Sequence, residues 1–182
     1  MKFYKMLTLT IICMLLSVPA LAQKPDEEAI KEAISEKFLK YTYNDFKKIE
    51  RFGVISIECG GDAEKIGLSE KSLTDYAKLR YKNNFGNFTF KEPTPEERSI
   101  YYDKAKGEKV GQIWFTIWAV GDDYPIAYYI RCTAGNYDRN DIWKNEVLGY
   151  GSKNNVPDTV KKAIDLMMEK LAIDFFKARG EM

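Results

Sequence analysis

The sequence contains no histidine and only three cysteines in 182 residues. Without histidine, the serine–histidine–aspartate and cysteine–histidine systems of nucleophilic catalysis are excluded, together with every metal site built on imidazole. A Cys-x-x-Cys spacing and the glycine-lysine-serine/threonine pattern of a phosphate-binding loop are also absent. We therefore expect no cofactor, no metal and no catalytic residue.

The sequence also has no excess of positive or negative charge. The 28 lysines and arginines are balanced by 27 aspartates and glutamates. Nucleic-acid binding depends on clustered positive charge, and a near-neutral chain gives no electrostatic reason to expect it. We expect no nucleic-acid partner.

Long apolar runs are confined to the beginning of the chain. Two lysines precede the apolar segment Met6 to Val18, and Ala20-Leu21-Ala22 supplies a small-x-small cleavage site. The apolar segment is shorter than the roughly 20 residues that a membrane-spanning helix needs. The sequence predicts a signal peptide over residues 1–22, cleaved at Ala22-Gln23. The mature protein would then be periplasmic or secreted, with no integral membrane span.

Two cysteines remain in the predicted mature chain, Cys59 and Cys132. Both lie in apolar, strand-like segments, where a cysteine packs as a small hydrophobic residue. An exported protein can also keep a disulfide, so a bridge remains the alternative. We expect both thiols to be free and buried.

Apolar residues recurring at helical spacing predict three helices. The first spans residues 26–41. The second begins after Ser69, a good N-cap, and runs to about Asn83. The third opens at Pro157 and ends near Arg179, with an apolar stripe of Val160, Ile164, Met167, Leu171 and Phe175.

Short apolar or alternating segments bounded by turn residues predict the strands. Gly60-Gly61 is expected to stop the first strand, and Gly121-Asp122-Asp123 is expected to form a hairpin turn. The predicted strands are Phe52–Cys59, Asn87–Glu92, Val110–Val120, Tyr124–Ala134 and Ile142–Ser152.

This order of elements predicts an α+β fold with a single mixed, mostly antiparallel sheet of about five strands. Two helices would pack on one face of the sheet, and an extra N-terminal helix would precede it. We divide the chain into a signal peptide (1–22), an N-terminal helix and connection (23–50), and an α/β domain (51–182).

The predicted hairpin places the two faces of its strands. If Gly121 lies opposite Tyr124, then Ile117 faces Tyr128 on an apolar side that packs against the two helices. The other side carries the candidate binding residues, with a cation–π contact expected where Trp114 faces Arg131. Aromatic residues and arginine are enriched at protein interfaces. The candidate binding residues are Trp114, Trp118, Tyr129 and Arg131. In the alternative, helix 26–41 lies across this side and hides it.

Short motifs add a resemblance that covers about residues 51–179. Gly67-Leu68-Ser69 and Leu79-Arg80 follow the first strand, and Trp143 and Gly149 precede the final helix. In these motifs the chain resembles a loose group of small periplasmic α/β domains like the N-terminal domain of TolB. The resemblance implies protein contacts in the envelope and carries over no active-site residue. We expect Leu79 to pack inward and Arg80 to be solvated.

Three functional hypotheses follow. The first is a non-enzymatic exported protein-interaction domain with an envelope protein as its partner. Whether the protein also forms a homo-oligomer is left open by the sequence. The second is a binder of a small apolar or peptide-like ligand between the sheet face and the N-terminal helix. The third is a carboxylate-based hydrolase, which needs two acids in a cleft. Glu58, beside Cys59, is the one acid in an apolar setting.

Overall fold

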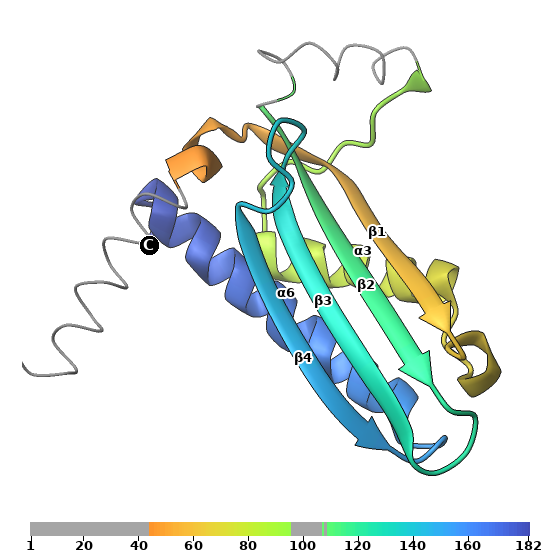
Figure 1. Cartoon of the computed structure of the whole chain (residues 1–182). Coiled ribbons are helices and arrows are strands. Elements are labelled where there is room, and N and C mark those ends of the chain that lie inside the picture. The colour runs from red at the N-terminus through yellow and green to blue at the C-terminus, as the bar shows by residue number, and fades with distance from the viewer. Residues whose placement is uncertain (1–43, 96–106, 108) are drawn as a thin grey trace, which may run out of the picture. The chain divides into compact units, whose positions relative to one another are not determined.

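The computed structural model describes residues 44–95, 107 and 109–182, which belong to one compact unit (Figure 1). The predicted signal peptide and the predicted helix 26–41 lie outside the described residues. Two short 3-10 helices, η1 (Asn44–Lys48) and η2 (Glu64–Ile66), flank the first strand. The longer elements are β1 (Arg51–Gly61), α3 (Glu70–Phe85), β2 (Val110–Val120), β3 (Ile126–Asn136), β4 (Trp143–Gly151) and α6 (Val156–Arg179).

The four strands form one sheet in the order β1-β2-β3-β4, and α3 and α6 pack on one of its faces (Figure 1). β1 runs parallel to β2, whereas the β2–β3 and β3–β4 pairs are antiparallel. The predicted α+β fold with a mixed sheet and two helices on one face is therefore confirmed. No helix among the described residues is long and apolar enough to cross a membrane.

The predicted strand Asn87–Glu92 makes only a single bridge, in which Phe90 pairs with Phe52 at the start of β1. The backbone N–H of Phe52 donates to Thr89, and that of Lys91 donates to Phe52, both at 3.0 Å. Pro93 follows and has no N–H with which to continue a ladder. The sheet consequently has four strands and this short attachment.

β1 ends at Gly61, so the predicted glycine pair does close the strand, but both glycines belong to it and it extends two residues beyond the predicted Cys59. Gly60 pairs with Trp118, and Gly61 pairs with Ala119. A Cβ on Gly60 would lie 2.3 Å from the indole ring of Trp118. Glycine is needed here because the tryptophan of the neighbouring strand lies over the backbone of β1.

The register of the β2–β3 hairpin differs by two residues from the predicted one. Ile117 pairs with Ile130, and Trp114 pairs with Thr133. The connecting loop is longer than expected because Pro125 cannot donate a ladder hydrogen bond, and β3 begins only at Ile126. A slip of two residues keeps every side chain on its predicted face, whereas a slip of one would have inverted both strands.

The helices bury their predicted faces against the sheet. The N-cap of α3 is Ser69, whose side chain accepts a hydrogen bond from the N–H of Ser72. Every residue of the predicted α6 stripe is buried, and Phe175 is completely so. The aromatic rings around Phe175 are those of Phe46, Phe52, Phe85, Phe88 and Phe176.

The roles predicted for Leu79 and Arg80 are wrong. Leu79 is 55% exposed, because it lies off the stripe with which α3 faces the sheet. Arg80 is tied to the neighbouring helix: its Nε and one terminal nitrogen donate to the carboxylate of Asp165 at 2.5 and 2.7 Å. The hydroxyl of Tyr76 donates to the same carboxylate at 2.7 Å. The stripe of α3 contains Leu73, Ala77, Tyr81 and Phe85.

Both thiols of the described chain are free, as predicted, but only Cys132 is buried, and Cys59 is partly exposed. β2 separates the strands that carry them, a distance of roughly 10 Å across two strand spacings. A disulfide joins Cα atoms about 4.4–6.8 Å apart, so the sheet itself prevents the bridge. Burial raises the pKa of Cys59 to about 11, and the carboxylates of Glu70 and Glu64 add to the shift.

The residues before β1 also belong to the packed unit. Phe46 and Ile49 are completely buried, and the ring of Phe46 meets that of Phe175 edge-on at 5.3 Å. Arg179, in the last turn of α6, donates to the carbonyl oxygens of Phe46 and Ile49 at 3.3 and 2.8 Å. The start of the described chain is thereby fastened to the end of α6.

Candidate functional site

The sheet face turned away from α3 and α6, here called the open face, is covered by no helix or strand among the described residues (Figure 1). All four candidate binding residues lie on it. Trp118 pairs directly with Tyr129 across the β2–β3 ladder, and Trp114 and Arg131 lie further along the same two strands. The structure therefore brings the predicted set together on one surface.

One end of the open face is apolar over three strands. Trp118, Tyr129 and Leu148 form one cross-strand row, and Val120, Ala127 and Tyr150 form the next. Trp118 is 51% exposed, Leu148 79% and Tyr150 75%. We call Trp118, Val120, Tyr129, Leu148 and Tyr150 the aromatic end. Contiguous apolar surface of this kind marks binding sites more often than chance exposure.

Charged groups lie next to the aromatic end, around Glu146 on β4. Its carboxylate lies 3.2 Å from the Lys144 ammonium and 3.6 Å from Nε of Arg131. A hydrogen bond from Tyr129, and then one from Lys144, lower the pKa of Glu146. Burial, followed by that same hydrogen bond, raises the pKa of Tyr129. The carboxylate is thus held ionised among two cations and a phenol.

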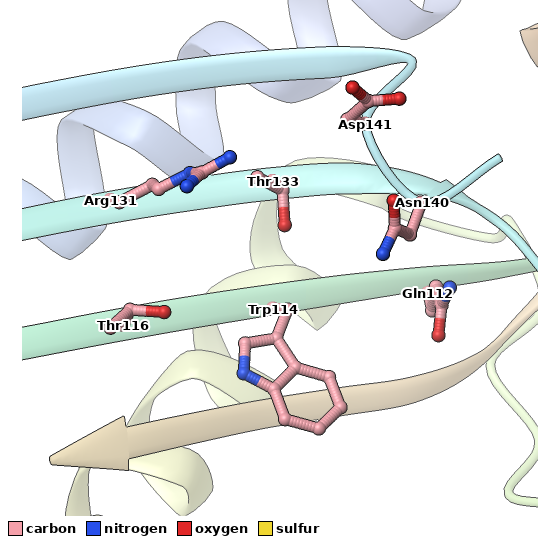
Figure 2. A pocket seen from close by; sticks show the side chains of 7 residues that line it. All are labelled: Gln112, Trp114, Thr116, Arg131, Thr133, Asn140 and Asp141. Carbon is pink, nitrogen blue, oxygen red and sulfur yellow. The ribbon is translucent and has the colours of Figure 1, made fainter.

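A polar hollow of about 340 Å³ opens beside Trp114. Figure 2 shows the indole reaching from β2 toward β1, while Arg131 and Thr133 project from β3. Nε of Arg131 is buried and makes no hydrogen bond in the described part of the chain, and it forms an ion pair with the Glu146 carboxylate at 3.6 Å. The hollow is lined by Gln112, Trp114, Thr116, Arg131, Thr133, Asn140 and Asp141.

The predicted facing pair of Trp114 and Arg131 is wrong, because the register places Trp114 opposite Thr133 and Arg131 opposite Thr116. The two candidate residues line the same hollow from a diagonal position instead. Both residues therefore belong to one site, but the predicted cation–π contact between facing side chains is not formed.

The metal-ligating and carboxylate groups of the described residues bear on the hydrolase hypothesis. No group of three or more potential metal ligands occurs among them. The hollow contains one carboxylate, that of Asp141. Glu58, expected in an apolar setting, is exposed.

Sequence reasoning missed three of the five residues of the aromatic end, namely Val120, Leu148 and Tyr150. Leu148 and Tyr150 belong to β4, which was predicted as a strand without assigned faces. The signal was present in the alternation of Lys144, Glu146, Leu148 and Tyr150, which places all four on one face. The alternation does not show which strand lies beside β4. Only the pairing of β4 with β3 shows that this face continues the surface that carries Trp118.

The fold and the open face together define a small α+β domain with an aromatic surface that no helix or strand of the described residues covers. No known protein family and no curated protein matches this chain. The similar solved structures include two of the PelC dodecamer from Paraburkholderia phytofirmans. One, in space group P6, is 8% identical with a TM-score of 0.40, covering 69% of this chain and 89% of that chain. The other, a leucine-to-methionine variant in space group C2, is 8% identical with a TM-score of 0.39, covering 67% and 87%. So distant a likeness carries no argument about this chain.

Proposed function

We propose that this protein is a non-enzymatic, exported interaction domain of the cell envelope, and that its open face binds a protein partner. The observation that carries the proposal is the aromatic end. Its exposed side chains lie side by side on three strands, while most of the other large apolar side chains of the strands, apart from Trp114 and Val147, are packed under the helices. Their exposure to water is unfavourable, and a partner that covers them would gain the free energy of burying apolar area.

The composition of the open face fits a protein partner. Tryptophan, tyrosine and arginine are the residue types that contribute most to binding at protein interfaces, usually within a ring of polar groups. Here Trp118 and Tyr129 would form the centre, with Arg131, Lys144 and Glu146 beside them. Because Gln112, Thr133 and Asn140 line the hollow beside Trp114 with polar groups, we expect the partner to place a polar group there.

The two other hypotheses have less support. Hydrolases that act through carboxylates hold two of them across a cleft, whereas the hollow has Asp141 alone. A ligand site between the sheet and the N-terminal helix depends on residues 26–41, which lie outside the described part of the chain. A ligand of drug-like size would bury most of its surface in a pocket, whereas Leu148 and Tyr150 of the aromatic end are 79% and 75% exposed.

Site-directed photo-crosslinking in the intact cell tests the proposal. A photoreactive amino acid in place of Tyr150 should trap one defined partner, and the same probe in place of Leu79, on the far side of the domain, should not. The adduct should disappear when Trp118→Ala is added, because the centre of the interface is lost, and should survive Leu166→Ala. Equal trapping from both probe positions, or an adduct indifferent to Trp118→Ala, would contradict binding at the open face.

Export is tested separately. The mature chain should begin at Gln23, because the small residues of Ala20-Leu21-Ala22 fit the cleavage site of signal peptidase. The intact mass of protein recovered outside the cytoplasm measures this directly. A mass that still includes residues 1–22 would show that the segment is retained.

A further inference from the structure

The sheet has two edge strands, and the structure covers only one of them. Along β1, the outward N–H groups of Ile57 and Cys59 donate to side chains of α3, at 3.2 Å to Thr74 and 2.9 Å to Glu70. The segment that ends at Lys91 bonds to the beginning of the same strand. Proteins protect edge strands in this way because unpaired backbone groups recruit further strands.

Within residues 44–95 and 109–182, β4 has no such protection. It bonds to β3 on one side, and no described residue bonds to the backbone on its other side. An apolar groove of about 560 Å³ runs between this edge and α6. Val147 faces the helix layer but is 38% exposed, and Leu166 on α6 is 67% exposed. The groove is lined by Asn145, Val147, Thr159, Lys162, Ala163, Leu166, Met167, Glu169, Lys170 and Ile173.

We propose that a second copy of this chain docks on the free edge. The two β4 strands would pair antiparallel about a two-fold axis at Asn145, forming one continuous sheet with the two α6 helices side by side on it. Such a contact is self-complementary, as a two-fold interface requires. It adds main-chain hydrogen bonds to the burial of the groove, as in other cases of strand addition.

The charges of β4 favour this axis. An antiparallel pair centred on Asn145 places Lys144 opposite Glu146 of the partner subunit, and the symmetry repeats the contact. Opposite charges at facing positions stabilise a strand pair, whereas like charges destabilise it.

The position of α6 gives a second argument for the same axis. Gly151 lies against Val156 at one end of β4, where a Cβ on the glycine would be 3.2 Å from the valine. At the other end, Trp143 donates to Asp174 at 2.8 Å. Both stretches are about 27 Å long, at roughly 3.3 Å per strand residue and 1.5 Å per helical residue. Helix and strand are therefore antiparallel, and Asn145 lies level with residues 169 and 170.

A two-fold axis at that level makes the groove side of α6 complementary to itself. Glu169 meets Lys170 of the partner subunit, and Leu166 meets Ile173 of the partner subunit. Strand charges, helix charges and apolar side chains are thus all matched by one axis. The strand part of this contact shares Lys144 and Glu146 with the proposed partner site, whereas the groove side of α6 contains no residue of that site, so substitutions on α6 test the dimer alone.

Substitution of the exposed leucine on α6 is the first test. Sedimentation equilibrium of the mature protein should show a concentration-dependent dimer. Leu166→Arg should give a monomer, because it sets a charge in the closed groove. The matched control is Leu79→Arg, an equally solvated leucine on α3, which should remain dimeric. A wild-type protein that is monomeric at every concentration, or a dimer that survives Leu166→Arg, would overturn the proposal.

A charge exchange tests the axis itself. Glu169→Lys sets like charges against each other twice, and so does Lys170→Glu. Each should raise the dimer dissociation constant about tenfold. The double variant restores the opposite pairing and should return the constant to near the wild-type value. Both side chains are exposed in the monomer, so folding is unaffected. Absence of rescue, or a closed ring larger than a dimer, would rule out the two-fold axis.

Discussion

Phe175 is the residue on which the core most depends. It is completely buried, and its ring lies 4.9 Å from Phe88 and 5.4 Å from Phe52. Phe175→Ala should lower the free energy of unfolding by about 3–5 kcal/mol, since a large cavity replaces the ring. Urea denaturation followed by circular dichroism measures the change. Phe176→Ala, at the partly exposed neighbour, should cost clearly less, and equal losses at the two positions would contradict this account of the core.

Cys59 should be a poorly reactive thiol at neutral pH. Burial raises its pKa to about 11, and the carboxylate of Glu70 contributes the next largest share. The reactive thiolate is therefore scarce at pH 8 and increases as the pH approaches 11. Glu70→Gln removes the charge but keeps an oxygen for the Cys59 N–H, so it should lower the pKa and speed alkylation.

Alkylation rates across a pH series measure this effect, with Glu181→Gln as a control remote from the thiol. Cys132 should react more slowly than Cys59 in the folded protein, because it is buried and burial raises its pKa as well. A Glu70→Gln profile that coincides with the wild-type profile would show that Glu70 exerts no electrostatic influence on the thiol.

Single residues show where sequence reasoning reached its limit. The burial of Phe175 follows from helical periodicity, which is a local pattern. The role of Gly60 does not follow from a local pattern. Glycine is needed there because the indole of Trp118, far away in the sequence, occupies the space of a side chain. Only the parallel pairing of β1 with β2 brings the two together, and no local pattern specifies that pairing.

At the scale of elements, α3 and α6 are joined by the cluster of Arg80, Tyr76 and Asp165. Asp165→Asn should lower the thermal midpoint of unfolding. The Arg80 guanidinium would lose its bidentate carboxylate partner and keep a single neutral acceptor. Asp75→Asn, at an exposed acid of α3, is the matched control and should leave the midpoint unchanged. Two variants with the same midpoint would mean that the cluster does not stabilise the helix pair.

The elements themselves were largely predictable, whereas their connections were not. Both described helices and the four strands appear where the sequence predicts them, because amphipathic stripes and alternation are local. The hairpin register failed at Pro125, where the missing N–H lengthens the loop. Leu79 and Arg80 failed for another reason: their roles were assigned from the pair by itself, and the stripe of α3 was not used to check them.

At the scale of the whole molecule, the sequence predicted which side of the hairpin carries the candidate site, but not how far the site extends or how accessible it is. The alternation in the β2–β3 hairpin set Trp114, Trp118, Tyr129 and Arg131 on one side. The extent of that surface depends on β4, and its accessibility depends on what else in the chain or the cell covers it. Neither property is encoded in a single strand, so both required the assembled sheet.

Tryptophan accessibility in the mature protein decides whether the open face is free. Trp114 and Trp118 are exposed on the open face, whereas Trp143 is buried and donates to Asp174. Acrylamide should therefore quench two tryptophans readily and leave one protected. In the double variant Trp114→Phe/Trp118→Phe, the remaining emission should resist quenching, which assigns the protected class to Trp143. If Trp114 and Trp118 were as protected as Trp143 in the wild-type protein, the open face would be covered. The aromatic end could then bind no partner without first losing that cover.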